Sequence, residues 1–246
     1  MTILQNAANV LRLFGSGCEN VTVTEVSDML DMPKANASRL LKSMRDAGMV
    51  ETIGDTRRHR PGKLMLDLAS AFRHSSSLIG RASDIVAEVS RTFGHTGYVS
   101  LREGREVTGV ADFPGSNVLR VMGAVGRRLE AKNSATGRSL LARISDDEVR
   151  DLYQGDPDLD ALLPKLAQVR ECGFAYSEQE ATRGVDAIAL ALADPQTDEA
   201  VSLCIVYPHA VIDRDGRNEM IAALAEGATR AAKDLGDSGF VAPRTS

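Results

Sequence analysis

Residues 21–63 read VTVTEVSDMLDMPKANASRLLKSMRDAGMVETIGDTRRHRPGK, and the organisation of the chain follows from them. Thr22 is followed three residues later by Glu25. This is a capping box, which starts a helix because it satisfies two free backbone N–H groups reciprocally. The tight connection Asp31-Met32 precedes Pro33, whose fixed φ suits a first helical position. The sequence therefore predicts two short helices that cross sharply, as in a helix-turn-helix.

The second of these helices has two chemically distinct faces. The i, i+3, i+4, i+7 spacing of one buried stripe is occupied by Ala37, Leu40, Leu41 and Met44. The opposite face carries side chains that reach phosphate oxygens or base edges, and none of them is acidic. We expect DNA contacts from Lys34, Asn36, Ser38, Arg39 and Lys42.

A short β-ribbon is predicted after this helix. Ala47-Gly48 is a helix stop, residues 49–53 contain the β-branched side chains of a strand, and Gly54-Asp55-Thr56 turns the chain. Residues 33–63 hold eight Lys or Arg against three Asp or Glu, a net charge of +5 in a chain of total charge −5. Because this charge coincides with helix and ribbon, DNA binding is favoured over an ordinary solvated face. A wing along a DNA backbone would use Arg57, Arg58 and Arg60.

These residues resemble the winged helix-turn-helix of the IclR family of bacterial transcriptional regulators. The similarity rests on Glu25, Met32-Pro33-Lys34, Arg39-Leu40-Leu41 and Ala47-Gly48-Met49-Val50-Glu51. It covers nearly the whole chain and implies an α+β fold in three parts. They are a winged helix-turn-helix domain at residues 1–63, a linker helix at residues 64–77, and a GAF-like effector-binding and oligomerisation domain with an antiparallel sheet at residues 78–246. In the family the linker helps to pair DNA-binding domains; a plain connector packed on its own domain is the alternative.

Length and composition agree with two domains, because 246 residues with 43% hydrophobic content suit two cores. No apolar run approaches the roughly 18 residues of a membrane span, and the first residues lack the pattern of a signal peptide. We therefore expect a cytoplasmic protein with no membrane contact.

The three cysteines and four histidines show no metal-ligand spacing, so we expect no metal and no cofactor. Residues 1–81 carry a net charge of +3 and residues 82–246 a net charge of −8, which favours ligand sensing or subunit pairing by the second part.

Periodicity and turn residues divide the rest of the chain into further elements. Helices are predicted at residues 3–14, 64–74, 78–93, 134–141, 145–153, 159–172 and 214–235. Strands are predicted at residues 98–101, 106–111, 174–176, 186–193 and 200–207. Residues 118–125 fit a strand or a loop equally well. Strands collected into one sheet with helices around it indicate an α+β domain.

The family resemblance also implies an effector pocket. Ser134 to Ala142, Gly173-Phe174-Ala175, Gly184-Val185 and Ala187-Ile188-Ala189 are similar to its effector domain. Carried over by position, the pocket residues are Val118, Val121, Ala135, Thr136, Ser177, Val185, Ala187, Cys204 and Val206. The sequence departs from the family pattern just before the helix, at Glu130, Lys132 and Asn133.

This apolar set suggests a small organic acid whose charged end meets the helix start at Ala135-Thr136-Gly137. Ordinary core packing explains the same apolar residues equally well. The departures before the helix make the choice of ligand the least transferable feature of the family.

The function most favoured is a sequence-specific regulator that is not an enzyme, with a repressor preferred to an activator. It would bind double-stranded operator DNA as a homodimer or homotetramer, with an affinity set by the acid. One alternative is an enzyme with a DNA-binding appendage, using Cys204 as nucleophile and His209 as base, although no third partner is evident. The other is a module that binds proteins through the same helix-turn-helix.

Overall fold

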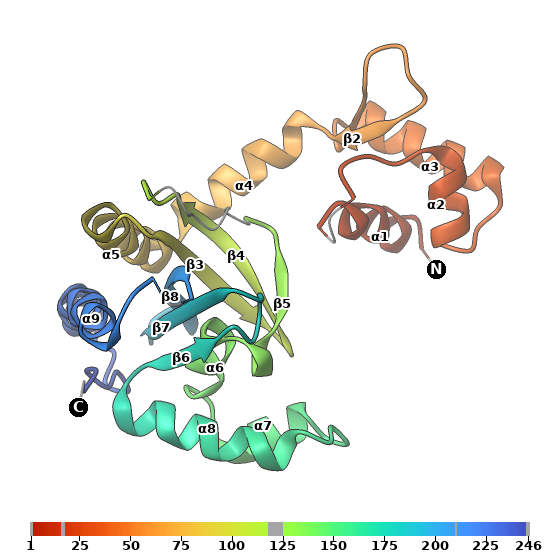
Figure 1. Ribbon diagram of the computed structural model, residues 1–246. Helices are drawn as coiled ribbons and strands as arrows, with labels where there is room; N and C mark the ends of the chain where they lie inside the picture. Colours follow the sequence, from red (N-terminus) through yellow and green to blue (C-terminus); the bar gives the residue numbers. More distant parts are fainter. Residues whose placement is uncertain (1, 16–17, 118–124, 210, 245–246) are drawn as a thin grey trace. The chain divides into compact units, whose positions relative to one another are not determined.

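The computed structural model describes residues 2–15, 18–117, 125–209 and 211–244. The chain forms two compact units, Met1–Ser75 and Ser76–Ser246. The first is mostly helical and the second is built on an antiparallel sheet (Figure 1), which confirms the predicted α+β fold class. Within the described ranges, no helix combines the length and the apolar character needed to span a bilayer.

Three helices build the core of the first unit (Figure 1): α1 (Ile3–Gly15), α2 (Val23–Met29) and α3 (Lys34–Asp46). The predicted capping box is present, because Thr22 N donates to Glu25 Oε2 at 2.7 Å and Glu25 N donates to Thr22 Oγ1 at 3.2 Å. The apolar stripe of α3 closes the core, whose buried side chains are Ala7, Val10, Val21, Val26, Ala37, Leu40, Leu41, Met44 and Val50.

The connection between α2 and α3 passes through the left-handed region at Asp31, where φ is 47°, a conformation that Asp tolerates better than most residues. Ser27 Oγ donates to the Met32 carbonyl at 2.6 Å, and Met32 N donates to the Ser27 carbonyl at 3.0 Å, which closes the turn. Pro33 is the N-cap of α3 and not its first helical residue as the sequence predicts. Its ψ of 138° is extended, while its carbonyl accepts from Ala37 N at 3.1 Å.

The ribbon consists of β1 (Val50–Thr52) and β2 (His59–Pro61), which are antiparallel. Strand β1 is shorter than the strand predicted at residues 49–53. The chain between the two strands closes a turn, in which Ile53 N donates to the Arg58 carbonyl at 3.0 Å. Val21 adds a bridge to the second strand, since Val21 N donates to the His59 carbonyl at 2.8 Å and His59 N donates back at 2.7 Å. The wing is thereby tied to the segment before α2.

Helix α4 (Lys63–Ser75) follows the ribbon directly. Gly62 is required at this junction, because a Cβ there would lie 2.2 Å from the Gly48 carbonyl oxygen. Three apolar side chains of α4 are exposed, namely Leu66 at 68%, Leu68 at 55% and Phe72 at 49%. Leu68 and Phe72 are four residues apart and therefore share one face of the helix. Exposed apolar side chains of this kind are typical of a surface that another protein surface covers.

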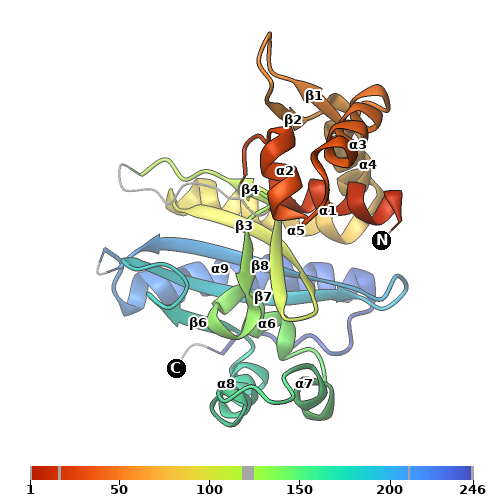
Figure 2. The same cartoon turned by 90° about the vertical axis from the view of Figure 1, so that its right-hand side faces the viewer.

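A six-stranded antiparallel sheet organises the second unit (Figures 1 and 2), in the order β5-β4-β3-β8-β7-β6. The strands predicted at residues 98–101 and 106–111 pair as a hairpin, and so do those predicted at residues 186–193 and 200–207. Strand β5 was not predicted, and residues 118–124 of the ambiguous stretch lie outside the described residues. The strands are β3 (Thr96–Glu103), β4 (Glu106–Phe113), β5 (Arg128–Glu130), β6 (Ala175–Glu178), β7 (Val185–Asp194) and β8 (Glu199–Pro208).

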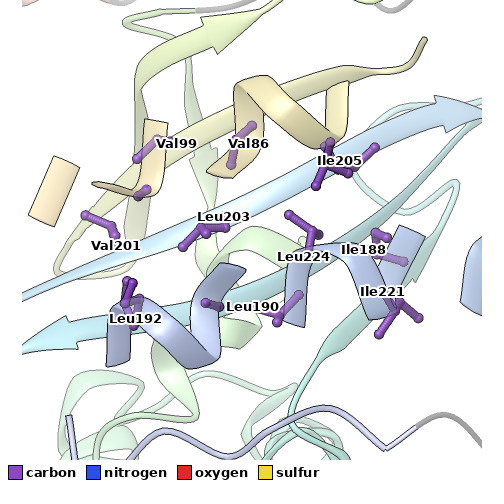
Figure 3. Packing of buried hydrophobic residues seen from close by; sticks show 14 of the residues in the cluster. Val86, Val99, Ile188, Leu190, Leu192, Val201, Leu203, Ile205, Ile221 and Leu224 are labelled. Carbon is purple, nitrogen blue, oxygen red and sulfur yellow. The ribbon is translucent and has the colours of Figure 1, made fainter. Parts of the chain in front are cut away.

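Large branched side chains cover one face of this sheet (Figure 3). They alternate along the strands with the period of two that a pleated backbone imposes. Helices α5 (Ser77–Phe93) and α9 (Arg214–Leu235) pack against them. On this face the residues of β7 and β8 with 0% exposure are Ile188, Leu190, Leu192, Val201, Leu203 and Ile205.

The opposite face carries small side chains at the intervening positions, such as Ala189, Ser202 and Cys204. They let α6 (Ala135–Leu141) lie close to the sheet, so that Ser139 Oγ lies 2.9 Å from Ser202 Oγ. The 3₁₀ turn η1 (Ala131–Asn133) and the helices α7 (Asp146–Leu152) and α8 (Leu159–Cys172) complete this layer. This face of the sheet therefore combines small side chains with the N-terminus of the short helix α6.

Candidate DNA-binding surface and ligand pocket

The exposed residues of α3 are mostly polar or basic, with Ala35 and Asp46 as the exceptions. Its buried stripe faces the core, whereas every side chain predicted to contact DNA is exposed: Lys34, Asn36, Ser38, Arg39 and Lys42. Arg39 Nη2 donates to Asn36 Oδ1 at 2.6 Å, which orients both side chains on this face. Within the described part of the chain, Lys34 and Lys42 have no ion-pair partner. These cations are therefore available to an external anion.

Arg57, Arg58 and Arg60 of the wing have the same predicted role, but their surroundings in the structure differ. Arg60 Nη2 lies 2.7 Å from Glu51 Oε1 across the ribbon, at the register that pairs these two residues. Arg58 Nη1 donates to Asn20 Oδ1 at 2.5 Å, and its Nη2 lies 3.8 Å from Glu25 Oε1. Among the described residues, the Arg57 side chain has neither an ion-pair partner nor a hydrogen-bond partner. Of the three, Arg57 is the cation most ready to meet a phosphate.

His59 anchors the wing from inside. It is 8% exposed, and no hydrogen bond to its Nδ1 is present among the described residues. Burial lowers the pKa of His59, and the nearby positive charge of Arg45 lowers it further. The imidazole is therefore held neutral, and the charge of the wing comes from its arginines.

A pocket opens on the small-residue face of the second unit, with an empty volume of about 470 Å³ that includes open solvent. The structure brings seven of the nine predicted effector residues to this one pocket. They are Ala135, Thr136, Ser177, Val185, Ala187, Cys204 and Val206. The other two, Val118 and Val121, lie outside the described residues.

The sequence missed six lining residues: Tyr98, Arg127, Leu129, Ser134, Ala181 and Thr182. Tyr98 reaches the pocket because it pairs with Cys204 of β8, a strand distant in sequence, and cross-strand partners share a face. Arg127 gives no sequence signal, since it lies outside every predicted element.

Burial controls the chemistry of the pocket wall. It raises the pKa of Tyr98 to about 12 and the pKa of Cys204 to about 11. Both groups are therefore neutral at physiological pH. Arg127 is the charged side chain among the described lining residues.

The Cys204 and His209 pair considered for catalysis is not assembled. Cys204 lies in the pocket, whereas His209 Nδ1 lies 3.1 Å from Asp186 Oδ1. The raised pKa of Cys204 opposes the thiolate that a nucleophile requires. No group of three or more potential metal ligands occurs within the described residues.

Two family models match the chain. The model for the bacterial transcriptional regulator IclR C-terminal domain matches residues 71–232, and the model for the IclR helix-turn-helix domain matches residues 3–54. The HTH-type transcriptional repressor AllR of Escherichia coli K12 is 23% identical over 222 residues, which cover 86% of this chain and 82% of AllR.

Solved structures share the fold. An IclR transcriptional regulator from Alicyclobacillus acidocaldarius superposes with a TM-score of 0.83 at 22% identity, covering 94% of this chain and 97% of that one. An IclR homologue from Microbacterium hydrocarbonoxydans, solved with 4-hydroxybenzoate, gives a TM-score of 0.79 at 18% identity, covering 96% and 100%. The matched families and AllR are transcriptional regulators and not enzymes, which confirms the predicted class of function. The chain belongs to the IclR family of bacterial transcriptional regulators.

Proposed function

We propose that this regulator binds operator DNA through α3 and the wing, and that a small organic acid in the pocket of the second unit changes its affinity for DNA. The observation that carries the proposal is the outer face of α3, where all five predicted contact residues are exposed and none is acidic. A polar and basic helix face beside a basic ribbon suits the major groove and the adjoining phosphates.

The two parts of this surface have different roles in the proposal. Asn36, Ser38 and Arg39 read base edges, because such side chains distinguish base pairs in the major groove. Lys34 and Lys42 hold the helix against the backbone, and Arg57, Arg58 and Arg60 hold the wing against it. The wing then contributes affinity without sequence preference, and its contribution falls with salt.

The proposal includes a homodimer, or a tetramer made of two such dimers. The exposed side chains Leu66, Leu68 and Phe72 of α4 are better covered by a second copy than by water. A dimer presents two copies of α3 about one helical turn of DNA apart, on a roughly palindromic operator in the cytoplasm. Sedimentation of the purified protein tests this, because Leu66→Ser with Phe72→Ser is expected to weaken the assembly.

The ligand class follows from the pocket walls. Val185, Ala187 and Val206 suit an apolar carbon body, and 4-hydroxybenzoate in the Microbacterium homologue is an acid of that kind. AllR is named a repressor, which supports repression relieved by the acid. Such relief requires only that the acid favour one arrangement of the paired domains by a few kcal/mol, of order 1–3 in typical cases.

Gel-shift and nuclease footprinting on promoter fragments from its own locus test the function. At low salt the wild-type protein is expected to protect a palindromic segment. The double variant Arg39→Ala with Lys42→Ala is expected to lose that protection, whereas the matched surface variant Arg230→Ala on α9 is expected to keep it. Unchanged protection by the double variant would exclude α3 as the reading element. No shift by the wild type with or without acids would refute DNA binding and favour the protein-interaction alternative.

A further inference from the structure

The start of α6 is an incomplete partner for a carboxylate. The helix has only seven residues, so few peptide dipoles add along its axis. Ser134 Oγ already accepts the hydrogen bond of Gly137 N at 3.0 Å, which occupies one of the free amides. A carboxylate that leaves water for an apolar pocket needs an opposite full charge. The pocket wall supplies one such charge, from a side chain that the sequence did not single out.

The backbone at Arg127, a residue that lines the pocket, is hydrogen-bonded to β4. Its carbonyl accepts from Gly109 N at 3.3 Å, and the preceding Gly126 N donates to the Gly109 carbonyl at 2.8 Å. These bonds continue the pairing of β5 with β4. The side chain therefore leaves a fixed backbone position, which reduces the entropy lost when a ligand binds.

The guanidinium of Arg127 reaches across to the loop between β6 and β7. Its Nη2 donates to Thr182 Oγ1 at 3.3 Å, and both residues line the same pocket. No carboxylate pairs with Arg127 among the described residues, whereas the neighbouring Arg128 Nη1 binds Glu106 Oε2 at 2.8 Å. Arg127 thus has a neutral hydroxyl partner and an unbalanced charge beside an apolar hollow.

We infer that Arg127 binds the carboxylate of the effector and that the Thr182 hydroxyl donates a second hydrogen bond to it. The inference rests on the proposed effector pocket and names the group that recognises the acid. A carboxylate at this place replaces the neutral Thr182 oxygen as acceptor for Arg127, and charge-assisted hydrogen bonds are the stronger kind. It also joins the β4–β5 side of the pocket to the β6–β7 loop.

The same arrangement sets a charge limit on the ligand. Arg127 supplies one positive charge, and the other described lining residues are apolar or neutral. A second carboxylate on the ligand would be buried without a partner, which is costly. The pocket therefore selects monocarboxylic acids with an apolar body and disfavours dicarboxylic acids of similar size.

Calorimetry on the full-length protein tests the inference, with benzoate, hexanoate and butyrate as acids, benzamide as the neutral analogue of benzoate, and terephthalate as the diacid. Wild-type protein is expected to bind benzoate more tightly than benzamide or terephthalate. Arg127→Gln is expected to weaken benzoate about tenfold to a hundredfold, the range for loss of a hydrogen bond to a charged group, and to leave benzamide unchanged. Arg127→Lys is expected to restore part of the benzoate affinity.

Two controls separate recognition from general charge and from folding. Arg128→Gln removes the adjacent arginine, which does not line the pocket, and is expected to bind benzoate as the wild type does. Thermal melting of Arg127→Gln is expected to match the wild type because the side chain is exposed. If the wild type binds these acids and Arg127→Gln binds them equally well, Arg127 does not recognise the carboxylate, but the proposal of an acid-binding pocket is still supported. If the wild type binds none of them, the acid-binding pocket and the inference both fall, whatever the variants do.

Discussion

Gly137 of α6 is in direct backbone contact with Ala131 of η1. A Cβ at position 137 would lie 2.2 Å from both Ala131 Cα and its carbonyl oxygen. The contact brings the 3₁₀ turn against the helix that carries Ala135 and Thr136 to the pocket. Because residue 137 has no side chain, α6 can lie against η1 in the position that brings Ala135 and Thr136 to the pocket.

Gly137→Ala is expected to destabilise the second unit. The added methyl meets backbone atoms, which move less easily than side chains, so the cost should lie near or above the upper end of the roughly 1–3 kcal/mol typical of overpacking. Urea unfolding followed by circular dichroism measures the change. The matched variant Gly80→Ala on α5, where a Cβ meets nothing within 4 Å, is expected to be as stable as the wild type or more so. Equal midpoints for Gly137→Ala and the wild type would contradict the packing described here.

Arg57→Ala is expected to weaken binding to specific and unrelated DNA alike. Arg57 has no acidic partner among the described residues, so its whole charge is available to a phosphate. Loss of one phosphate contact lowers the slope of log affinity against log salt by about 1. Fluorescence anisotropy over a salt series measures this slope. The variant Arg91→Ala, at the end of α5 in the other unit, is the control and should keep the wild-type slope.

Glu51→Gln is expected to have the opposite effect on DNA affinity. Glu51 engages Arg60 at 2.7 Å, so its amide variant removes a negative charge from the wing and frees a guanidinium. The side chains are 56% and 34% exposed for Arg60 and Glu51, and surface pairs contribute only about 0–1 kcal/mol to stability. We therefore expect nearly unchanged melting together with tighter, more salt-dependent binding. Weaker binding would mean that Glu51 is needed to position Arg60.

Cys204 is expected to resist alkylation. Burial raises its pKa to about 11, and only the thiolate is nucleophilic, so reactivity at pH 8 is confined to a small thiolate fraction. Cys18 and Cys172 are only partly buried and should react first with iodoacetamide. Peptide mass spectrometry over a pH series measures the three rates. Cys204 labelling as fast as that of Cys172 at pH 8 would show that the pocket is open to water.

Local chemistry made part of this structure predictable. The capping box of Thr22 and Glu25, the stripe of α3 and the two strands on either side of Gly104 each depend on neighbouring residues, and each is found. Strand β5 could not be predicted, because its three residues become a strand only by pairing with β4. For the same reason Arg127 was missed, since its place in the pocket depends on that distant pairing. The seven pocket residues that were predicted were reached by family resemblance, not by periodicity.

The wing is expected to loosen in mild acid. Burial and Arg45 lower the pKa of His59 below its ordinary value of about 6.5, so the unfolded chain binds a proton more readily than the folded one. The stability that His59 contributes is therefore fully present above about pH 6.5, and it is lost as the pH falls through the lower folded pKa. Because His59 pairs with Val21, amide hydrogen exchange in peptides spanning these two residues, corrected for intrinsic rates, should quicken below that pH. The variant His59→Phe removes the titration and should abolish the acid dependence in these peptides. Equal acid dependence in this variant would place the titrating group elsewhere.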